Sequence, residues 1–154
     1  GTRRSGLVAS SGAMRLRYYG IEVAADFRKA IDYSKWFTGV RGDIHSSFAH
    51  EIAATEFECQ GLELDRVGVC WCWDMLATAG GVTPRTLKGM KWQAAKPGRP
   101  QDFIINKYRV LLTRAREGMV IWVPQGSDKD GSRPALEVDR IAAYLKACGV
   151  RTIS

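Results

Sequence analysis

The residues best suited to chemistry are the arginines of a predicted helix near the end of the chain. Residues 108–116 read Tyr-Arg-Val-Leu-Leu-Thr-Arg-Ala-Arg, and an apolar run at residues 119–123 follows. The guanidinium of arginine is planar, stays charged and binds phosphate oxygens with two parallel hydrogen bonds. The pattern therefore predicts that one of these arginines reaches a phosphate. A basic helix with one solvated face is the alternative interpretation.

A second candidate segment is residues 55–65, which runs from Thr55 to Gln60-Gly61-Leu62-Glu63 and ends at Asp65. A glycine between polar residues lets the backbone approach a ligand closely. Backbone amides at a following turn can hold a phosphate, and Glu63 can accept a hydrogen bond from a sugar hydroxyl. The alternative is an ordinary loop closed by a glycine.

A third segment, residues 8–17, places Ser10, Ser11 and Gly12 at the end of a predicted strand, with Arg15 just beyond. Small hydroxyl residues and a glycine at a strand end suit contact with phosphate. An ordinary turn from strand to helix is the alternative.

These segments need a scaffold, and the hydrophobic pattern predicts one. Apolar runs predict strands, helical spacing predicts the other elements, and their alternation predicts an α/β fold with a mostly parallel sheet and flanking helices. The strands are expected at residues 7–10, 51–55, 67–73 and 119–123, and the helices at 23–37, 103–116 and 136–147. We expect one domain over residues 1–154, with an irregular basic insertion at about residues 75–100.

Bulk properties narrow the class of protein. The chain has 154 residues and a formal net charge of +7, which favours a polyanionic partner such as nucleic acid, although a solvated basic surface is the alternative. No apolar run is long enough for a membrane span, so no membrane partner is expected. The four cysteines lack zinc-ligand spacing, which indicates reduced, buried thiols in a cytoplasmic protein.

Together the three segments resemble a known family. Gln60-Gly61-Leu62-Glu63, with Thr55 ahead of it, resembles motif V of superfamily-one helicases of the UvrD type, and residues 112–116 resemble their motif VI. The sequences of the three segments resemble even more closely those of a bacterial group of DNA/RNA-helicase-like proteins related to the Schlafen helicase region. The resemblance extends from about Leu7 to Gly149, and implies the C-terminal RecA-like domain of such a helicase.

The resemblance also implies roles for single residues. Arg114 matches the motif VI arginine that contacts the γ-phosphate of ATP and would act in catalysis. Glu63 matches the acid near the nucleotide sugar, and Gln60 and Gly61 belong to the same nucleotide-binding motif. Thr55 and Gly61 match positions that touch the nucleic-acid backbone, and Ser10 and Ser11 would touch it too. Ala9 stands where motif IV has an arginine, so Arg15 is the expected substitute at the nucleotide.

The chain has no Gly-x-x-x-x-Gly-Lys-Ser/Thr sequence, the loop that cradles phosphates in P-loop NTPases. We therefore expect ATP and Mg²⁺ to be bound jointly with an N-terminal RecA-like domain of the same polypeptide, which supplies the P-loop. The chain alone would not turn over ATP. The nucleic acid can be DNA or RNA.

Two other functions stay open. One is a nucleic-acid-binding module with no ATPase role, in which Tyr18, Tyr19 and Trp92 stack on bases. The other is a metal-dependent hydrolase or nuclease, because two histidines and two acids can hold a divalent ion. The residues of that metal site would be Asp43, His45, His50 and Glu51.

Overall fold

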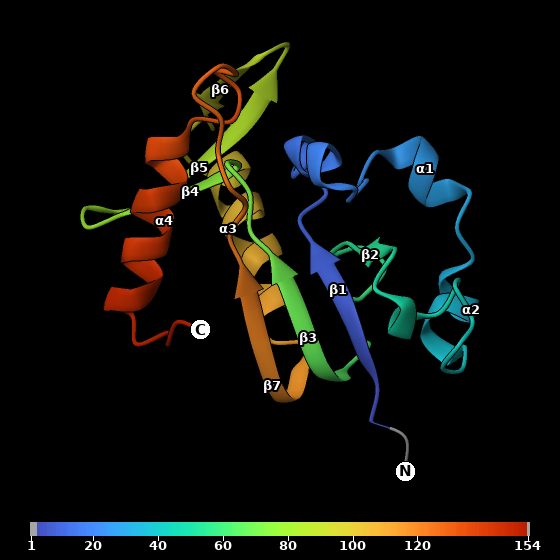
Figure 1. The fold of residues 1–154 in the computed structure, drawn as a ribbon. Coiled ribbons are helices and arrows are strands. Elements are labelled where there is room, and N and C mark those ends of the chain that lie inside the picture. The colour runs from blue at the N-terminus through green and yellow to red at the C-terminus, as the bar shows by residue number, and fades with distance from the viewer. Residues whose placement is uncertain (1–2, 154) are drawn as a thin grey trace.

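A parallel sheet forms the centre of the computed structural model, which describes residues 3–153. Its strand order is β2-β1-β3-β7, and all three neighbouring pairs run parallel. The strands are β1 (Ser5–Ala9), β2 (Ala53–Ala54), β3 (Leu64–Cys70) and β7 (Ala115–Trp122). Figure 1 shows them side by side, with their carboxyl ends at the top. The predicted α/β fold with a mainly parallel sheet is confirmed, and it is compatible with a RecA-like fold.

Helices flank this sheet. The long ones are α3 (Arg99–Leu112) and α4 (Ala135–Ala147), and the short ones are η1 (Met14–Tyr19), α1 (Ala25–Lys29), α2 (Tyr33–Thr38) and η2 (Ser47–Ala49). On one face, Leu111 of α3 packs in a cluster with Val67 and Val69. On the other, Leu16 of η1 packs with the upper residues of β1 and β3. Figure 1 shows α3 behind the sheet, α4 beside β7, and α1 and α2 beyond β2.

Residues 75–100, predicted as an irregular basic insertion, are mostly regular. They form an antiparallel sheet in the order β4-β5-β6, with β4 at Met75–Thr78, β5 at Gly81–Lys88 and β6 at Lys91–Ala94. Pro84 argues against a central strand, because proline lacks the N–H that a ladder requires. However, β5 changes partner beside Pro84: residues 81–84 pair with β4, and residues 85–88 pair with β6. The proline therefore interrupts neither ladder.

The helix predicted at residues 23–37 is also wrong, since two short helices, α1 and α2, replace it. The break has a local cause. The side chain of Asp32 accepts a hydrogen bond from the backbone N–H of Lys35 at 3.1 Å and so caps the start of α2. Aspartate favours this capping position over a helix interior.

Candidate functional site

The motif-like residues that precede β3 and β7 meet at one edge of the parallel sheet. Glu63 directly precedes β3, and Arg114 directly precedes β7. These strands are neighbours, and the backbone N–H of Leu64 donates to the carbonyl oxygen of Arg114 at 2.9 Å. Glu63 also forms an exposed ion pair with Arg116 at 3.7 Å. We call this place, at the amino ends of β3 and β7, the motif edge.

Arg114 is half-buried at the motif edge and holds the segment that carries Glu63. Its Nη1 donates to the carbonyl oxygens of Leu62 at 3.2 Å and Cys59 at 3.4 Å. Its Nε donates to the carbonyl oxygen of Val110 at 3.0 Å. Its Nη2 donates to the hydroxyl of Thr113 at 3.1 Å. A guanidinium has five N–H groups, so one N–H of Nη2 has no hydrogen-bond partner in the described structure. Arg114 is therefore both a brace for the loop and a cation within reach of the surface.

Gln60 and Gly61 lie exposed on the same loop, just before Glu63. Gly61 has a φ of 80°, a left-handed conformation that other residues rarely adopt. Its turn is closed by a hydrogen bond from the N–H of Leu62 to the carbonyl oxygen of Cys59, at 3.0 Å. The structure thus brings Gln60, Gly61, Glu63 and Arg114 together, and their contact with a nucleotide stays a prediction.

Gly61 is the one residue predicted to touch nucleic acid that lies at the motif edge; Ser10, Ser11 and Thr55 lie at the opposite edge, where β1 and β2 end. Ser10 and Thr55 are fully buried there, so their side chains do not reach the surface in this structure. Ser11 is half-buried, and both its N–H, at 2.8 Å, and its hydroxyl donate to the carboxylate of Glu56. Lys107 of α3 donates to the hydroxyl oxygen of Ser11 at 3.0 Å. The three residues lie near one another, and their contact with nucleic acid stays a prediction.

Arg15 is not part of the motif edge. It lies on η1, beyond the carboxyl end of β1, and is buried. Its Nη2 contacts the carbonyl oxygen of Gly89 at 3.4 Å and the sulfur of Met90 at 2.9 Å. Within this chain Arg15 and Arg114 therefore do not approach the same ligand, and the assignment of Arg15 to the nucleotide lacks geometric support.

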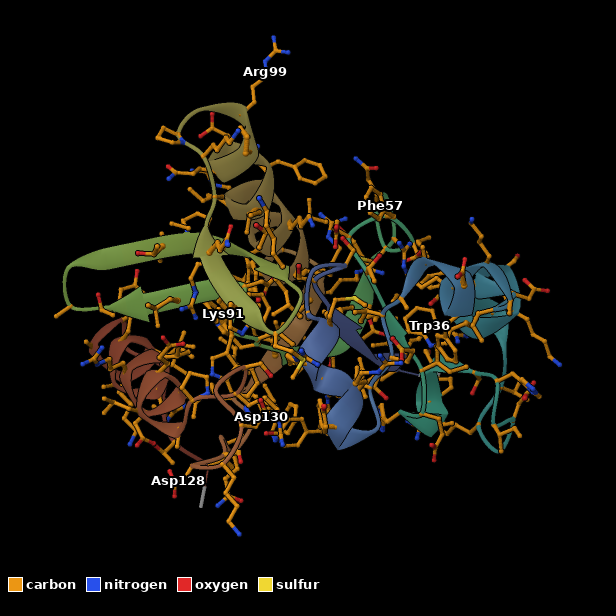
Figure 2. All side chains as sticks on the ribbon, turned by 90° about the horizontal axis from the view of Figure 1, so that it is seen from above. Trp36, Phe57, Lys91, Arg99, Asp128 and Asp130 are labelled. Atoms are coloured by element: carbon orange, nitrogen blue, oxygen red, sulfur yellow. The ribbon has the colours of Figure 1, made fainter. Side chains whose placement is uncertain are left out.

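An aromatic pair that the sequence interpretation missed projects from the carboxyl-end side. Phe57, two residues after Thr55, and Phe103 of α3 each expose 53% of their surface. A cation stands over each ring: Arg28 is 5.2 Å from the centre of Phe57, and Lys107 is 4.8 Å from that of Phe103. Lys107 also pairs with Glu56, the neighbour of Phe57, at 3.5 Å. Figure 2 shows Phe57 at the outer rim of the molecule. Exposed rings beside cations can stack on bases.

The carboxyl group of Asp74 is buried beneath the edge where β1 and β2 end. Asp74, at the end of the β3 segment, accepts a hydrogen bond of 2.6 Å from the hydroxyl of Tyr108, and its Oδ2 has no hydrogen-bond partner in the described structure. Burial raises the pKa of Asp74 above its usual value of 3.8, and the hydroxyls of Ser10 and Tyr108 and the charge of Lys107 oppose this only in part. The fold therefore favours the neutral carboxyl.

The variant Asp74→Asn is expected to change how stability depends on pH. A carboxyl whose pKa is raised by folding holds more protons in the folded than in the unfolded state, so wild-type stability falls as pH rises from about 4 through the folded pKa. Asparagine cannot ionise, so this fall is absent. Urea unfolding at several pH values measures it, and parallel curves for the two proteins would contradict the prediction. Asp74→Ala, which leaves the Tyr108 hydroxyl without its acceptor, is expected to be less stable at every pH.

Comparison with known families decides which family these motifs belong to. The model of the Schlafen group 3 DNA/RNA helicase domain matches residues 1–125. The chain belongs to this Schlafen family. The match includes the motif edge, the aromatic pair and the antiparallel sheet, and ends before α4. Family membership indicates a helicase-related function. The searches of curated proteins and of solved structures gave no match.

The alternative metal site is not assembled in this Schlafen-family domain. His45 contacts Asp43 at 3.3 Å, whereas the ring of His50 lies 3.0 Å from the hydroxyl of Ser5. Residues 3–153 contain no group of three histidine, cysteine, aspartate or glutamate residues that could hold a metal ion. In the same part of the chain, no helix is long and apolar enough to cross a membrane.

The aromatic residues of the binding-module alternative are mostly engaged within the Schlafen-family domain. The Nε1 of Trp92 donates to the carbonyl oxygen of Ser132 at 2.8 Å. The hydroxyl of Tyr19 donates to the carbonyl oxygen of Gln125, and its ring stands edge-on to Trp122. Tyr18 exposes 53% of its surface, and Arg133 lies 4.1 Å from its ring centre, so it resembles Phe57 and Phe103 in exposure and in its neighbouring cation. Of the three aromatic residues, Tyr18 therefore stays available for base stacking, together with Phe57 and Phe103.

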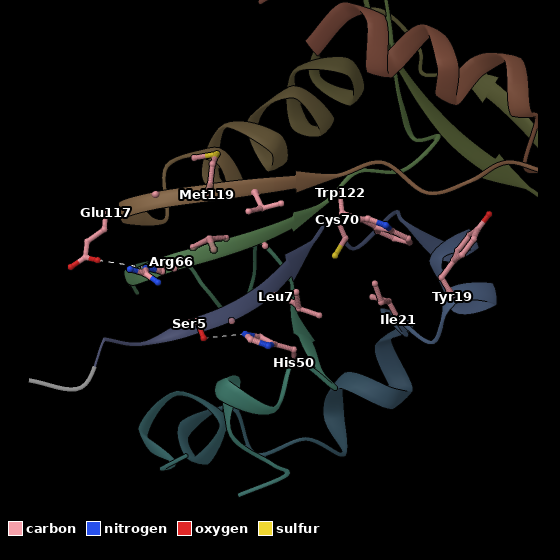
Figure 3. Close-up of a pocket in the computed structure, with 15 residues that line it drawn as sticks. Ser5, Leu7, Tyr19, Ile21, His50, Arg66, Cys70, Glu117, Met119 and Trp122 are labelled. Carbon is pink, nitrogen blue, oxygen red and sulfur yellow. Dashed lines mark hydrogen bonds and ion pairs between the residues drawn. The ribbon is translucent and has the colours of Figure 1, made fainter. Parts of the chain in front are cut away.

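One face of the parallel sheet stays partly open. Parallel sheets are usually covered on both faces, yet a cavity of about 760 Å³ lies over β1, β3 and β7. Figure 3 shows its apolar floor and walls, with Leu7, Cys70 and Trp122 among them. Two polar pairs border it, Ser5 with His50 at 3.0 Å and Arg66 with Glu117 at 3.8 Å. The described residues leave this apolar surface open to solvent.

Proposed function

We propose that this chain is the C-terminal RecA-like half of an ATP-dependent DNA or RNA helicase or translocase. The single observation that supports this most is the meeting of Glu63 and Arg114 at one edge of the sheet, in a chain of the Schlafen helicase family. ATP and Mg²⁺ would be bound jointly with a P-loop domain of the same polypeptide, packed against the motif edge.

The surroundings of Arg114 suit this role. Its present acceptors are neutral carbonyl and hydroxyl oxygens, and its contact with Cys59 is long, at 3.4 Å. A hydrogen bond between a guanidinium and a phosphate is roughly twice as strong as one between neutral groups. A γ-phosphate at this edge would therefore engage the free N–H of Nη2 and compete for the others. ATP supplies the phosphoryl group, and Arg114 stabilises the negative charge that develops on it.

The segment from Thr55 to Glu63 connects the two edges of the sheet. It leaves β2 at the carboxyl edge, carries Phe57 at the surface, and reaches Glu63 at the motif edge, where Arg114 holds the carbonyl of Leu62. When Arg114 turns toward a phosphate, its hydrogen bond to the carbonyl oxygen of Leu62 weakens. We propose that this connection couples ATP turnover to the grip of Phe57 on a single strand.

The experiment measures ATP hydrolysis by the natural protein that contains this domain, as a function of the concentration of a single-stranded oligonucleotide. We expect stimulation by the strand. The variant Phe57→Ala should raise the concentration needed for half-maximal stimulation about 5- to 150-fold, since stacking one base contributes about 1–3 kcal/mol.

Phe27→Ala is the matched control, because Phe27 is also an exposed phenylalanine but lies on α1. It should leave the half-maximal concentration unchanged. ATP hydrolysis that no DNA or RNA strand stimulates would refute the proposed motor, and strand binding without any hydrolysis would favour a binding module instead.

A further inference from the structure

The positive charge of the chain is concentrated in the antiparallel sheet and the segment that follows it. Between Asp74 and Asp102 the sequence contains five basic residues and no acidic one. This stretch therefore supplies five of the seven net positive charges of the whole chain. The basic residues are Arg85, Lys88, Lys91, Lys96 and Arg99.

Only one of these five cations is neutralised within the described structure. Arg85 forms two hydrogen bonds with the carboxylate of Glu137, at 2.7 and 3.0 Å. The other four are exposed and have no ion pair with any described residue: Lys88, Lys91, Lys96 and Arg99.

The hairpin of β5 and β6 sets two of these lysines face to face. Its turn has only two residues, Gly89 and Met90, and the φ of 61° at Gly89 fits the tight turns that join antiparallel strands. Lys88 and Lys91 are consequently direct cross-strand partners. Like charges in this position lower stability, because the two side chains lie close together on one face. A bound anion would remove that cost.

The same face of the hairpin continues with polar residues. Thr86 and Gln93 are the next cross-strand pair on the side of Lys88 and Lys91, and all four are exposed. The opposite face carries Leu87 and Trp92, which are half-buried. The outward face therefore offers ammonium, hydroxyl and amide groups, and the exposed side chain of Met90 lies beside it in the turn.

The hairpin is fixed with this face outward. Arg85 also donates to the carbonyl oxygen of Trp73 at 2.8 and 3.0 Å, which joins the hairpin to the end of the β3 segment. Trp92 is anchored to Ser132, and Arg15 contacts the turn at Met90. Lys88 and Lys91 therefore project from a rigid support.

Arg99, at the start of α3, is another exposed cation without an ion pair to any described residue. It is the first residue of that helix, where the backbone dipole already contributes partial positive charge. Figure 2 shows its side chain extending away from the rest of the molecule. Lys96 follows Lys91 by five positions along a largely extended chain, or about 16 Å at roughly 3.3 Å per residue. The unpaired charges therefore span several phosphates of a strand.

We propose that this basic arm, formed by Thr86, Lys88, Lys91, Gln93, Lys96 and Arg99, binds the phosphate backbone of DNA or RNA without reading its sequence. The choice of nucleic acid as the polyanion rests on the proposed function. The large apolar side chains that the hairpin exposes are Val82 and Met90. Two separate side chains do not form the apolar face with which interfacial segments enter a membrane, which argues against a membrane surface. Binding through phosphates also requires no ATP.

The test uses the natural protein that contains this domain and its variant with Lys88, Lys91, Lys96 and Arg99 all changed to Gln. Fluorescence anisotropy measures binding of a labelled oligonucleotide, as single-stranded DNA, single-stranded RNA and duplex DNA, over a range of salt concentrations. For a single strand, each lost phosphate contact lowers the slope of log K against log salt by about 0.7, so four lost contacts lower it by about 3.

A charge-matched control changes Lys29, Arg140, Lys146 and Arg151 to Gln, since these exposed cations lie on α1, on α4 and near the C-terminus. The proposal expects little change in slope for the control and no loss of melting temperature for the arm variant. An unchanged slope for the arm variant, or an equal fall in both variants, would overturn it. The proposal would also be overturned if the arm variant lost binding to phosphatidylserine vesicles while it still bound the oligonucleotides.

These results are separable from the motor function. If ATP hydrolysis depends on Arg114 but the arm variant binds strands normally, the motor stands and the arm proposal fails. If the arm variant loses binding while no ATP is hydrolysed, the arm proposal stands and the motor fails.

Discussion

Replacing Arg114 by alanine in the natural protein is expected to lower kcat for ATP hydrolysis about 10³- to 10⁵-fold, the range that arginine fingers contribute. The reason is electrostatic, because the guanidinium at the motif edge would face the charge that builds up on the transferred phosphoryl group. Steady-state ATP turnover at saturating nucleic acid measures the effect.

Two further variants separate catalysis from structure. Arg114 also braces the carbonyls of Cys59 and Leu62, so Arg114→Ala can loosen the loop as well as remove a cation. Arg114→Lys keeps the charge but loses the planar fork, and it should recover only part of the rate. Arg109→Ala removes an exposed arginine of α3, the helix that precedes Arg114, and should keep wild-type turnover. Undiminished turnover by Arg114→Ala would refute the role assigned to it.

Replacing Trp73 by alanine is expected to lower the free energy of unfolding of the domain by about 3–5 kcal/mol, the usual cost of deleting a buried tryptophan. Trp73 is fully buried beside Val138 of α4, and its Nε1 donates to the carbonyl oxygen of Pro134 at 3.1 Å. The loss is a large part of the 5–15 kcal/mol that holds a typical domain together. Urea unfolding followed by circular dichroism measures it.

Trp122 provides the matched control for this variant. It is a tryptophan of β7 with 37% of its surface exposed, and its ring contacts Tyr19 edge-on, with centroids 5.4 Å apart. Trp122→Ala removes the same atoms from a partly solvated place and should cost less than half as much. Equal losses for both variants would show that Trp73 does not hold α4 to the core.

The parallel sheet was predictable because apolar runs in the local sequence indicate its strands. The apolar run at residues 67–73 predicted β3, and the run at residues 119–123 predicted β7, each within a few residues of the observed bounds. Helical spacing predicted α3 and α4 for the same reason. Such periodicities depend only on which side chains face the core.

The hairpin of β5 and β6 was not predictable in the same way. Lysine, glycine and proline make up five of its fourteen residues, and the contacts that order it involve residues elsewhere in the chain. Arg85 is tied to Glu137 and Trp92 to Ser132, and both partners are about 40 residues or more away. Contacts between residues so far apart in the chain produce no periodic pattern in the local sequence.

The candidate site was predicted only in part. The adjacency of Glu63 and Arg114 follows from two loops that precede neighbouring parallel strands, which motif order could indicate. The burial of Ser10 and Thr55 and the exposure of Phe57 could not be predicted, because the chain turns inward at Glu56, which bonds to Ser11. An aromatic residue between two glutamates, Glu56 and Glu58, was the one signal available for Phe57.

The most direct test is a structure of the natural protein bound to a non-hydrolysable ATP analogue and a single strand. A nitrogen of the Arg114 guanidinium should lie about 2.7–2.9 Å from a γ-phosphate oxygen, the distance of a charge-assisted hydrogen bond, with Glu63 beside the ribose. If Arg114 still held the carbonyls of Cys59 and Leu62 while the nucleotide lay elsewhere, the proposed half-motor would be contradicted.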